Sequence, residues 1–288
     1  MSAPIFVDGL HAFFEHFDGF IIDQWGVLHN GSAPYEGALE GIEHLKRHGK
    51  RLVLLTNSGR RASTNERRMR ELGFDTGVLE GIVTSGEATW SALRDGLLPA
   101  FGNVGKRCYF VTNGSDMGPI EGLDIEPVDD IGDADFLYFT FLQSEIDDVP
   151  QFDPLLERAL ARNLPFLCSN PDRIAVTANG MTAAPGSVAA RYGDMGGEVI
   201  YVGKPHRPIY EACLAHLDGV DHSRIVCIGD SIEHDIKGAN NMNLASCFIE
   251  NGIHKDAFDK GADAGQALEK LVAEHGGRPT YVMPGFRW

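Results

Sequence analysis

Residues 20–23 read Phe-Ile-Ile-Asp, an apolar run that ends abruptly in a carboxylate. Residues 52–58 repeat the arrangement as Leu-Val-Leu-Leu followed by Thr-Asn-Ser, and residues 225–230 repeat it as Ile-Val-Cys-Ile followed by Gly-Asp. Helical patterns, for example over residues 36–48 and 60–72, separate such runs. Short buried strands that alternate with helices indicate βαβ units around a parallel sheet. The sequence therefore predicts a doubly wound α/β fold.

A second group of strands interrupts this pattern. Apolar runs at residues 108–111, 136–141 and 166–168 predict three further strands, and the first pattern returns near residue 199. We found no internal repeat, low-complexity tract or long Gly/Ser linker. The sequence therefore predicts a core of residues 1–98 and 199–288, interrupted by an α/β insert of residues 99–198.

The charge balance excludes some classes of partner. The chain has 288 residues, with 25 Lys and Arg against 41 Asp and Glu, and its net charge is −16. This charge disfavours a nonspecific nucleic-acid binder or a protein that docks on anionic lipid, since both need a basic face. A phosphorylated small molecule is still an acceptable ligand, because helix N-termini, a lysine and a metal ion can override net charge locally.

Cysteine usage and hydropathy predict a reduced, cytoplasmic protein. No apolar run reaches the ~18 residues of a membrane-spanning helix, and residues 1–8 do not resemble a signal peptide. The five cysteines are odd in number, widely spaced and mostly within apolar runs, so we expect buried thiols and no disulfide framework. They are Cys108, Cys168, Cys213, Cys227 and Cys247.

Four strand ends carry chemically useful side chains, namely Asp23, Thr56, Lys204 and Asp230. Ligands of open parallel sheets bind outside the carboxyl ends of the strands. A single acid at such a place is usually a turn or a cap, but two acids with a hydroxyl and a lysine are difficult to explain as caps. Two carboxylates from different strands can hold one Mg²⁺, and an aspartate can also attack phosphorus.

The remaining groups suit a phosphoryl ligand. Thr56 and the backbone N–H groups of Asn57 and Ser58 precede a helix and form a natural phosphate cradle. Lys204 offers positive charge to the oxygens of a transferring phosphoryl group. Asp235 follows Asp230 by five residues, where it could orient Lys204 or a metal-bound water.

The order of these motifs resembles the haloacid dehalogenase (HAD) superfamily of phosphatases. The matching segments are Asp-Gln-Trp-Gly-Val at residues 23–27, Thr-Asn at 56–57, Gly-Lys-Pro at 203–205, and Gly-Asp followed by Asp235 in residues 229–235. Together with Asn-Pro-Asp at residues 170–172 and the position of the insert, they resemble the class IIA cap subclass. That subclass includes nucleotide, pyridoxal phosphate and 4-nitrophenyl phosphate phosphatases.

The resemblance implies a fold and a set of roles. It implies a Rossmann-like core with an inserted cap domain and a homodimer formed through that cap. Asp23 would be the nucleophile and a Mg²⁺ ligand, together with Asp230 and the backbone carbonyl of Trp25. Thr56, Asn57 and Lys204 would hold the phosphate, with Asp235 in support of Lys204. Asn170 and Asp172 in the insert either face the substrate or form a structural turn.

Trp25 is a departure from the family pattern. Family phosphatases have a second aspartate at this position, which protonates the leaving oxygen and later activates water. Losing a general acid and base typically lowers the rate by ~10²–10⁴-fold. We therefore predict a Mg²⁺-dependent phosphatase that hydrolyses a small phosphomonoester through an aspartyl-phosphate. The substrate, a water or His29 would then carry out the proton transfers. Two alternatives stay open: a binding or regulatory module without turnover, and a dehalogenase, which the presence of Asp230 disfavours.

Overall fold

The computed structural model describes residues 3–98, 104–142, 149–177, 180–258 and 263–288. Contacts within the chain divide it into two compact units. The core unit comprises Met1–Thr56, Ser63–Val83 and Lys204–Trp288, and the insert unit comprises Asn57–Ala62 and Thr84–Gly203. Each unit contains a parallel sheet with helices, so the predicted doubly wound α/β class with an inserted α/β module is confirmed.

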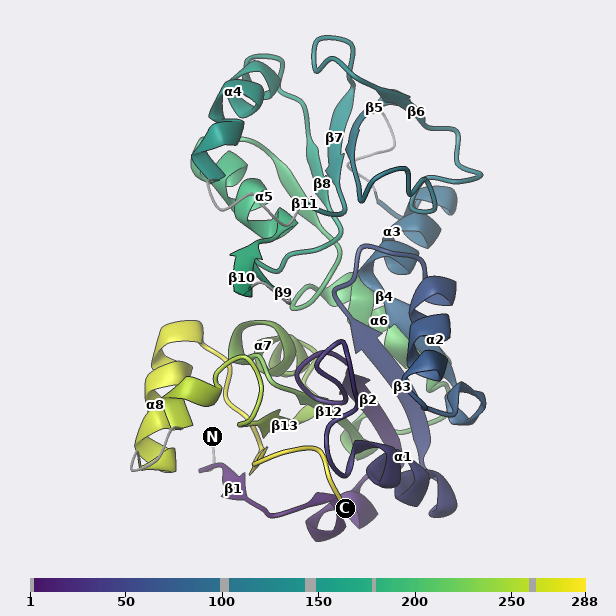
Figure 1. Cartoon of the computed structure of the whole chain (residues 1–288), viewed down its shortest axis with the longest axis vertical. Helices are drawn as coiled ribbons and strands as arrows, with labels where there is room; N and C mark the ends of the chain where they lie inside the picture. The colour runs from purple at the N-terminus through teal and green to yellow at the C-terminus, as the bar shows by residue number, and fades with distance from the viewer. Residues whose placement is uncertain (1–2, 99–103, 143–148, 178–179, 259–262) are drawn as a thin grey trace. The chain divides into compact units, whose positions relative to one another are not determined.

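Seven strands form the core sheet in the order β1-β14-β13-β12-β2-β3-β4. Strand β2 pairs in parallel with β3 on one side and with β12 on the other (Figure 1). Every residue of β2 and β12 is buried, which explains why both strands read as continuous apolar runs. The strands are β1 Ile5–Phe6, β2 Gly19–Asp23, β3 Arg51–Thr56, β4 Gly81–Thr84, β12 Ile225–Gly229, β13 Ala245–Ile249 and β14 Tyr281–Met283.

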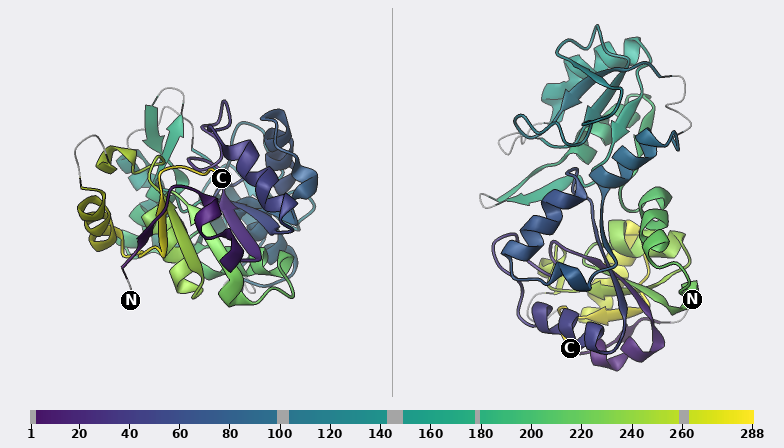
Figure 2. Two further views of the ribbon diagram at one scale, coloured as in Figure 1. Left: turned by 90° about the horizontal axis from the view of Figure 1, so that it is seen from below. Right: turned by 90° about the vertical axis from the view of Figure 1, so that its right-hand side faces the viewer.

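Helices cover both faces of the core sheet (Figure 2). Helices α1 Ala38–Arg47 and α2 Ala62–Glu71 bury Leu45 and Met69 in one apolar cluster with alternate strand residues such as Phe20 and Ile22. Helix α8 Ala264–His275 packs Leu268 in a separate cluster with Phe248 of β13. Helices α6 Arg207–His216 and α7 Lys237–Asn241 share this second face. Strand residues alternate between the two faces, as the period of two requires.

The insert unit has its own parallel sheet, in the order β11-β8-β7-β5-β6 (Figure 1). A separate antiparallel hairpin joins β9 and β10. The elements are α3 Ser85–Arg94, β5 Arg107–Val111, β6 Glu126–Val128, β7 Phe136–Phe139, α4 Asp153–Ala161, β8 Phe166–Cys168, β9 Ile174–Thr177, β10 Gly180–Ala183, α5 Pro185–Asp194 and β11 Val199–Tyr201. Helices α4 and α5 pack in one apolar cluster of this sheet and α3 in another.

The contact boundaries differ from the predicted boundaries at residues 98/99 and 198/199. Helix α3 lies before residue 99 in sequence, but its Ala92 packs with Phe136 of β7 in the insert unit. Strand β11 begins at Val199 and pairs with β8 of the insert sheet. The insert unit thus extends from Thr84 to Gly203, because side-chain packing and strand pairing assign these elements to its sheet.

All five cysteines are buried and unbridged, as predicted. Burial raises the pKa of each of these thiols above its usual range. Across the part of the chain that the structure describes, none of the helices combines the length and the apolar character needed to cross a bilayer.

Candidate active site

Three strands of the core sheet end in polar residues at the same edge. Asp23 is the last residue of β2, Thr56 is the last residue of β3, and Asp230 directly follows β12. The strand register pairs Asp23 with Leu55, the neighbour of Thr56. Because neighbouring parallel strands end together, the three side chains converge, and all three are buried.

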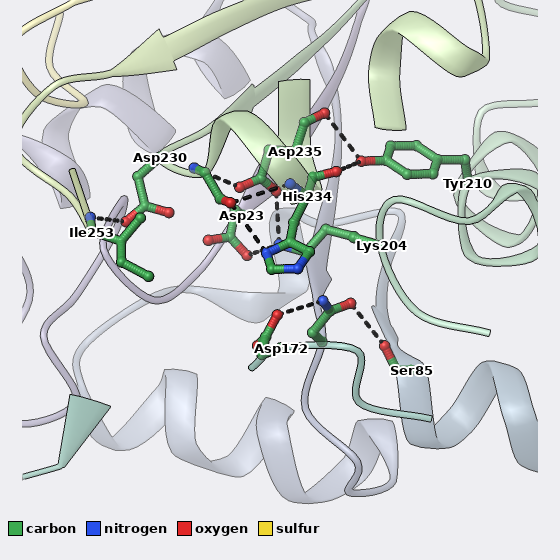
Figure 3. A network of polar contacts seen from close by, with 11 residues as sticks. Asp23, Ser85, Asp172, Lys204, Tyr210, Asp230, His234, Asp235 and Ile253 are labelled. Carbon is green, nitrogen blue, oxygen red and sulfur yellow. Dashed lines mark hydrogen bonds and ion pairs between the residues drawn. The ribbon is translucent and has the colours of Figure 1, made fainter. Parts of the chain in front are cut away.

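Lys204 connects two of the acids (Figure 3). Its Nζ donates hydrogen bonds to Oδ1 of Asp23 at 2.6 Å and to Oδ1 of Asp235 at 2.7 Å. The lysine side chain is only 5% exposed, so both ion pairs are shielded from water. Charge-assisted hydrogen bonds of this length are among the stronger polar contacts in proteins. They fix the ammonium group beside the nucleophile candidate.

Asp235 is held on a short turn of π-helix, Ile232–Ile236. The N–H of Ser231 donates to its second carboxylate oxygen at 3.1 Å, so both oxygens of Asp235 are engaged. The hydroxyl of Tyr210 lies 3.2 Å from the carbonyl oxygens of His234 and Asp235 and donates to this turn. Single π-turns inside helices often occur at functional sites. Here the turn directs Asp235 toward Lys204.

Asp230 lies between two glycines. An added Cβ would lie 1.9 Å from its Oδ2 at Gly26 and 2.1 Å from the same oxygen at Gly252. Gly26 also has a φ of +83°, which disfavours any other residue. The N–H of Ile253 donates to the same Oδ2 at 2.7 Å (Figure 3). Main chain from two separate segments, at residue 26 and at residues 252–253, therefore packs closely against this carboxylate.

The three carboxylates form a compact buried cluster. One oxygen each from Asp23, Asp230 and Asp235 lies within 4.8 Å of the others. Burial raises the pKa of Asp23 from 3.8 to about 7, against the lowering effect of Lys204. Burial, and then the charges of Asp23 and Asp235, raise the pKa of Asp230 well above its usual range. When all three carboxylates are ionised, they exceed the single ammonium by two negative charges, which a divalent cation with oxygen ligands would balance.

Trp25 and His29 belong to a turn beside the cluster. The indole is 43% exposed and meets the His29 ring edge-on, with centroids 5.6 Å apart. Nδ1 of His29 accepts the N–H of Gly31 at 3.0 Å. Burial, with a smaller effect of Arg68, lowers the pKa of His29 to about 4, so this imidazole is neutral at physiological pH. His29 thus stabilises the turn through the nitrogen that a general base would need.

The remaining predicted residues lie in the insert unit. The amide nitrogen of Asn57 donates to Asp172 at 2.7 Å, and the amide oxygen accepts the hydroxyl of Ser85 at 3.1 Å. Oδ1 of Asn170 accepts the N–H of Asp172 at 3.1 Å, which is a local side-chain turn. A Cβ on Gly203 would lie 2.7 Å from the Asn57 side chain. The glycine of Gly-Lys-Pro is thus explained by close packing within this unit.

Sequence reasoning did not find several supporting residues. Tyr210 donates to the main chain of the π-turn and Gly252 packs against Asp230, but nothing in the sequence indicates that either lies near the acids. Ser231 directly follows Asp230, but its N–H contact with Asp235 was not predicted. The role of Gly26 could have been predicted from the sequence, because this glycine lies within the Asp-Gln-Trp-Gly-Val segment. A glycine soon after a strand-end acid can indicate close approach by another polar group.

Comparisons with known proteins identify the family. Two models of haloacid dehalogenase-like hydrolases match residues 20–97 and 90–243, and a HAD-hydrolase-like model matches residues 201–287. The match over residues 90–243 alone spans more than half of the chain. The chain therefore belongs to the haloacid dehalogenase-like hydrolases.

Similar proteins include named phosphatases. The chain is 26% identical to D-glycerol 3-phosphate phosphatase of Mycobacterium tuberculosis, over 93% of this chain and 69% of that protein. It is 28% identical to 4-nitrophenylphosphatase of Schizosaccharomyces pombe, over 85% of this chain and 87% of that protein. A crystal structure of a haloacid dehalogenase-like hydrolase from Brucella suis has a TM-score of 0.82 at 29% identity, covering 97% of this chain and 99% of that chain.

Proposed function

We propose that this chain is a divalent-metal-dependent phosphatase that hydrolyses a small phosphomonoester through an aspartyl-phosphate on Asp23. The buried contact of Lys204 with both Asp23 and Asp235, beside Asp230, carries the proposal. Buried carboxylates with raised pKa values and a specific charge partner mark a candidate functional site, and ligands of open α/β sheets bind at the carboxyl ends of the strands. The named activities of similar proteins support the same class of reaction.

The donor set fits Mg²⁺. Asp23 and Asp230 provide hard oxygen ligands, and the backbone carbonyl of Trp25 is a third candidate. The two uncompensated charges of the buried cluster are a further reason to expect a divalent cation, since an unbalanced buried charge is strongly unfavourable. When bound, the cation supplies charge neutralisation between the attacking carboxylate and the phosphoryl oxygens. We assign to Asp235 the role of orienting Lys204, because both of its carboxylate oxygens already accept hydrogen bonds, from Lys204 and from Ser231.

The protein groups then have distinct roles. An Asp23 oxygen attacks phosphorus, and Lys204 stabilises the negative charge on the phosphoryl oxygens. The hydroxyl of Thr56 binds the phosphate at the end of β3. The side chain of Asn57 is bonded to Ser85 and Asp172, so we assign its contact with phosphate to the main-chain N–H. Water attack on the aspartyl-phosphate then releases phosphate and regenerates Asp23.

The domain roles follow the sequence prediction. We assign catalysis to the core unit, and we assign the insert unit, which was predicted as residues 99–198 and also includes α3 and β11, to a class IIA cap that selects the substrate. Asn170 and Asp172 belong to this region, and their mutual hydrogen bond gives Asn170 a structural role in the turn. A small phosphorylated metabolite is the expected substrate.

The test is release of phosphate from 4-nitrophenyl phosphate by the purified chain, with Mg²⁺ and with a chelator. We expect activity only with the metal, and loss of it in Asp23→Asn. Asp8→Asn is a matched control, because Asp8 belongs to the same unit and its side chain is 78% exposed. Binding of Mg²⁺ and phosphate by the wild type without turnover of any phosphomonoester would favour the binding module. Metal-independent release of halide from a haloacid would favour the dehalogenase.

A further inference from the structure

The boundary between the two units falls directly after Thr56. This residue ends β3 in the core unit, whereas Asn57–Ala62 belongs to the insert unit. Residues 57–61, which we call the phosphate loop, begin with the main-chain N–H group that the proposed function assigns to the phosphate. The hydrogen bonds of this loop show which residues of the insert unit hold it in place.

The side chain of Asn57 makes the first of these contacts. It is buried, and both ends of its amide are bonded within the insert unit. The nitrogen donates to Oδ1 of Asp172 at 2.7 Å, and the oxygen accepts the hydroxyl of Ser85 at 3.1 Å. An ionised carboxylate only accepts hydrogen bonds, so the amide nitrogen must face Asp172. The two partners therefore hold the first side chain of the loop in one orientation.

The surroundings of this amide are closely packed. An added Cβ at Gly203 would lie 2.7 Å from Oδ1 of Asn57 and 2.7 Å from Oγ of Ser85. The main chain of Asp172 is fixed in turn, because its carbonyl accepts the N–H of Gly186 at 3.0 Å. A buried polar network whose members are bonded in this way specifies one arrangement of its side chains.

The main chain of the phosphate loop is bonded to the start of helix α3. The N–H of Gly86 donates to the carbonyl of Ser58 at 3.0 Å, and the hydroxyl of Thr84 donates to the carbonyl of Arg60 at 2.6 Å. An added Cβ at Gly86 would lie 2.1 Å from the carbonyl oxygen of Gly59. The loop therefore lies directly against α3, and a side chain at residue 86 would displace it.

Glu87 of α3 holds the end of the loop. Its carboxylate accepts two hydrogen bonds from the guanidinium of Arg61, at 2.7 and 3.0 Å, and one from the N–H of Ala62 at 3.1 Å. Bidentate pairs of this kind are among the stronger polar contacts in proteins. The loop is thus fixed to the insert unit at both ends, and the contacts of Asn57 are the ones next to Thr56 in the sequence.

We propose that Asp172 and Ser85 are positioning residues for phosphate binding. Through the side chain of Asn57, they hold the main chain directly after Thr56 in the orientation that binds a phosphoryl group. This inference rests on the proposed phosphatase function and gives the insert unit a second task beside the selection of substrate. Small displacements of a binding group have large effects, since a misplacement of about 1 Å can lower a rate by ~10²-fold.

The test measures Kd of inorganic phosphate by calorimetry with saturating Mg²⁺, together with KM and kcat for 4-nitrophenyl phosphate. We expect Asp172→Ala to raise Kd about 10-fold and Ser85→Ala about 5-fold, because the first removes the hydrogen bond to a charged group. KM should rise in parallel and kcat should change less, since the bound substrate already makes these contacts. A merely structural role would lower Tm and leave Kd of the folded protein constant.

Asp172→Asn is the conservative variant. It keeps an oxygen that can accept the hydrogen bond from Asn57, so we expect Kd to rise less than about 3-fold. Asp153→Ala is the matched control, because Asp153 also lies in the insert unit and accepts two hydrogen bonds from Arg191, at 3.0 and 2.8 Å. It loses a comparable contact, and its Kd for phosphate should equal that of the wild type.

A double-mutant cycle tests whether Asp172 acts through Asn57. In the Asn57→Ala protein, adding Asp172→Ala should have no further effect on Kd, because the connecting side chain is already absent. Additive effects of the two substitutions would show that Asp172 contacts the ligand itself, and the positioning role would be wrong.

The two proposals fail in different ways. Wild-type Kd and KM in both Asp172→Ala and Ser85→Ala would overturn the positioning role and leave the phosphatase function standing. Equal losses of affinity in Asp172→Asn and Asp172→Ala would also overturn it, and this comparison decides the question if Asn57→Ala does not fold. Absence of both phosphate binding and metal-dependent turnover in the wild type would overturn the proposed function, and the positioning role with it.

Discussion

Ionisation of Asp23 should make the metal-free protein less stable as the pH rises. Burial raises the pKa of this carboxyl from 3.8 to about 7 in the folded protein. The folded state therefore holds a proton that the unfolded state releases, so stability is greatest below the unfolded pKa and is lost as the pH rises through about 7. A shift of about three pKa units corresponds to about 4 kcal/mol, of which about 2.5 kcal/mol falls between pH 5 and pH 8.

The assay is thermal unfolding in a chelator, followed by circular dichroism at several pH values between 5 and 8. With an unfolding entropy of about 2 cal/mol/K per residue, a difference of about 2.5 kcal/mol corresponds to ~4 °C in Tm for a chain of this length. Asp23→Asn cannot ionise at this position and also removes the charge that helps to raise the pKa of Asp230, so the Tm of the variant should rise relative to the wild type between pH 5 and pH 8. Asp8→Asn should follow the wild type.

Divalent metal should reverse the effect. Mg²⁺ at about 100 times its Kd would stabilise the folded wild type by about 2.7 kcal/mol at pH 8, and less at pH 5, where protons compete for the carboxylates. Asp23→Asn should lose most of this response. If the Tm difference between wild type and Asp23→Asn in chelator is the same at pH 5 and pH 8, the proposed burial of an ionisable Asp23 is wrong.

Three substitutions test the supporting contacts. Lys204→Met removes the cation between two buried carboxylates. We expect the free energy of unfolding in urea to fall by about 3–5 kcal/mol and kcat to fall by ~10²-fold or more. An unchanged urea midpoint of unfolding would contradict the buried ion pairs. Gly31→Ala should shift the fluorescence of Trp25 and destabilise the fold, because the added Cβ would lie 2.1 Å from Cη2 of the indole, while Gly49→Ala, at a φ of +70° with nothing within 4 Å, should show the backbone strain alone. Tyr210→Phe should lower stability by about 1 kcal/mol, and a neutral result would remove its hydroxyl from the support of the π-turn.

Much of the core sheet could be predicted from the sequence, because short local segments indicate where its strands lie and where they end. Asp23, Thr56 and Asp230 each end a buried strand, and buried parallel strands read as apolar runs regardless of what they pack against. The convergence of these residues then follows from sheet geometry alone. Their roles stay a proposal, but the structure brings them together at one sheet edge.

Other features depend on contacts that the sequence does not encode locally. Strand β14 has only three residues, and its place beside β13 is fixed by pairing with a distant segment. Helix α3 precedes the predicted insert, yet the apolar face that includes Ala92 packs on the insert sheet. The π-turn that holds Asp235 has no sequence pattern of its own, since it differs from an α-helix by one residue per turn.

Because every thiol is buried, the rate at which each cysteine reacts reports how often the fold opens around it. Alkylating reagents react with the thiolate, and raised pKa values combined with burial leave almost none of it accessible in the native fold. Cys108 and Cys168 belong to the insert unit, and Cys213, Cys227 and Cys247 to the core unit. Pulsed alkylation read out peptide by peptide should therefore yield two separate opening free energies, and metal should slow labelling of the three core-unit thiols more than that of the other two.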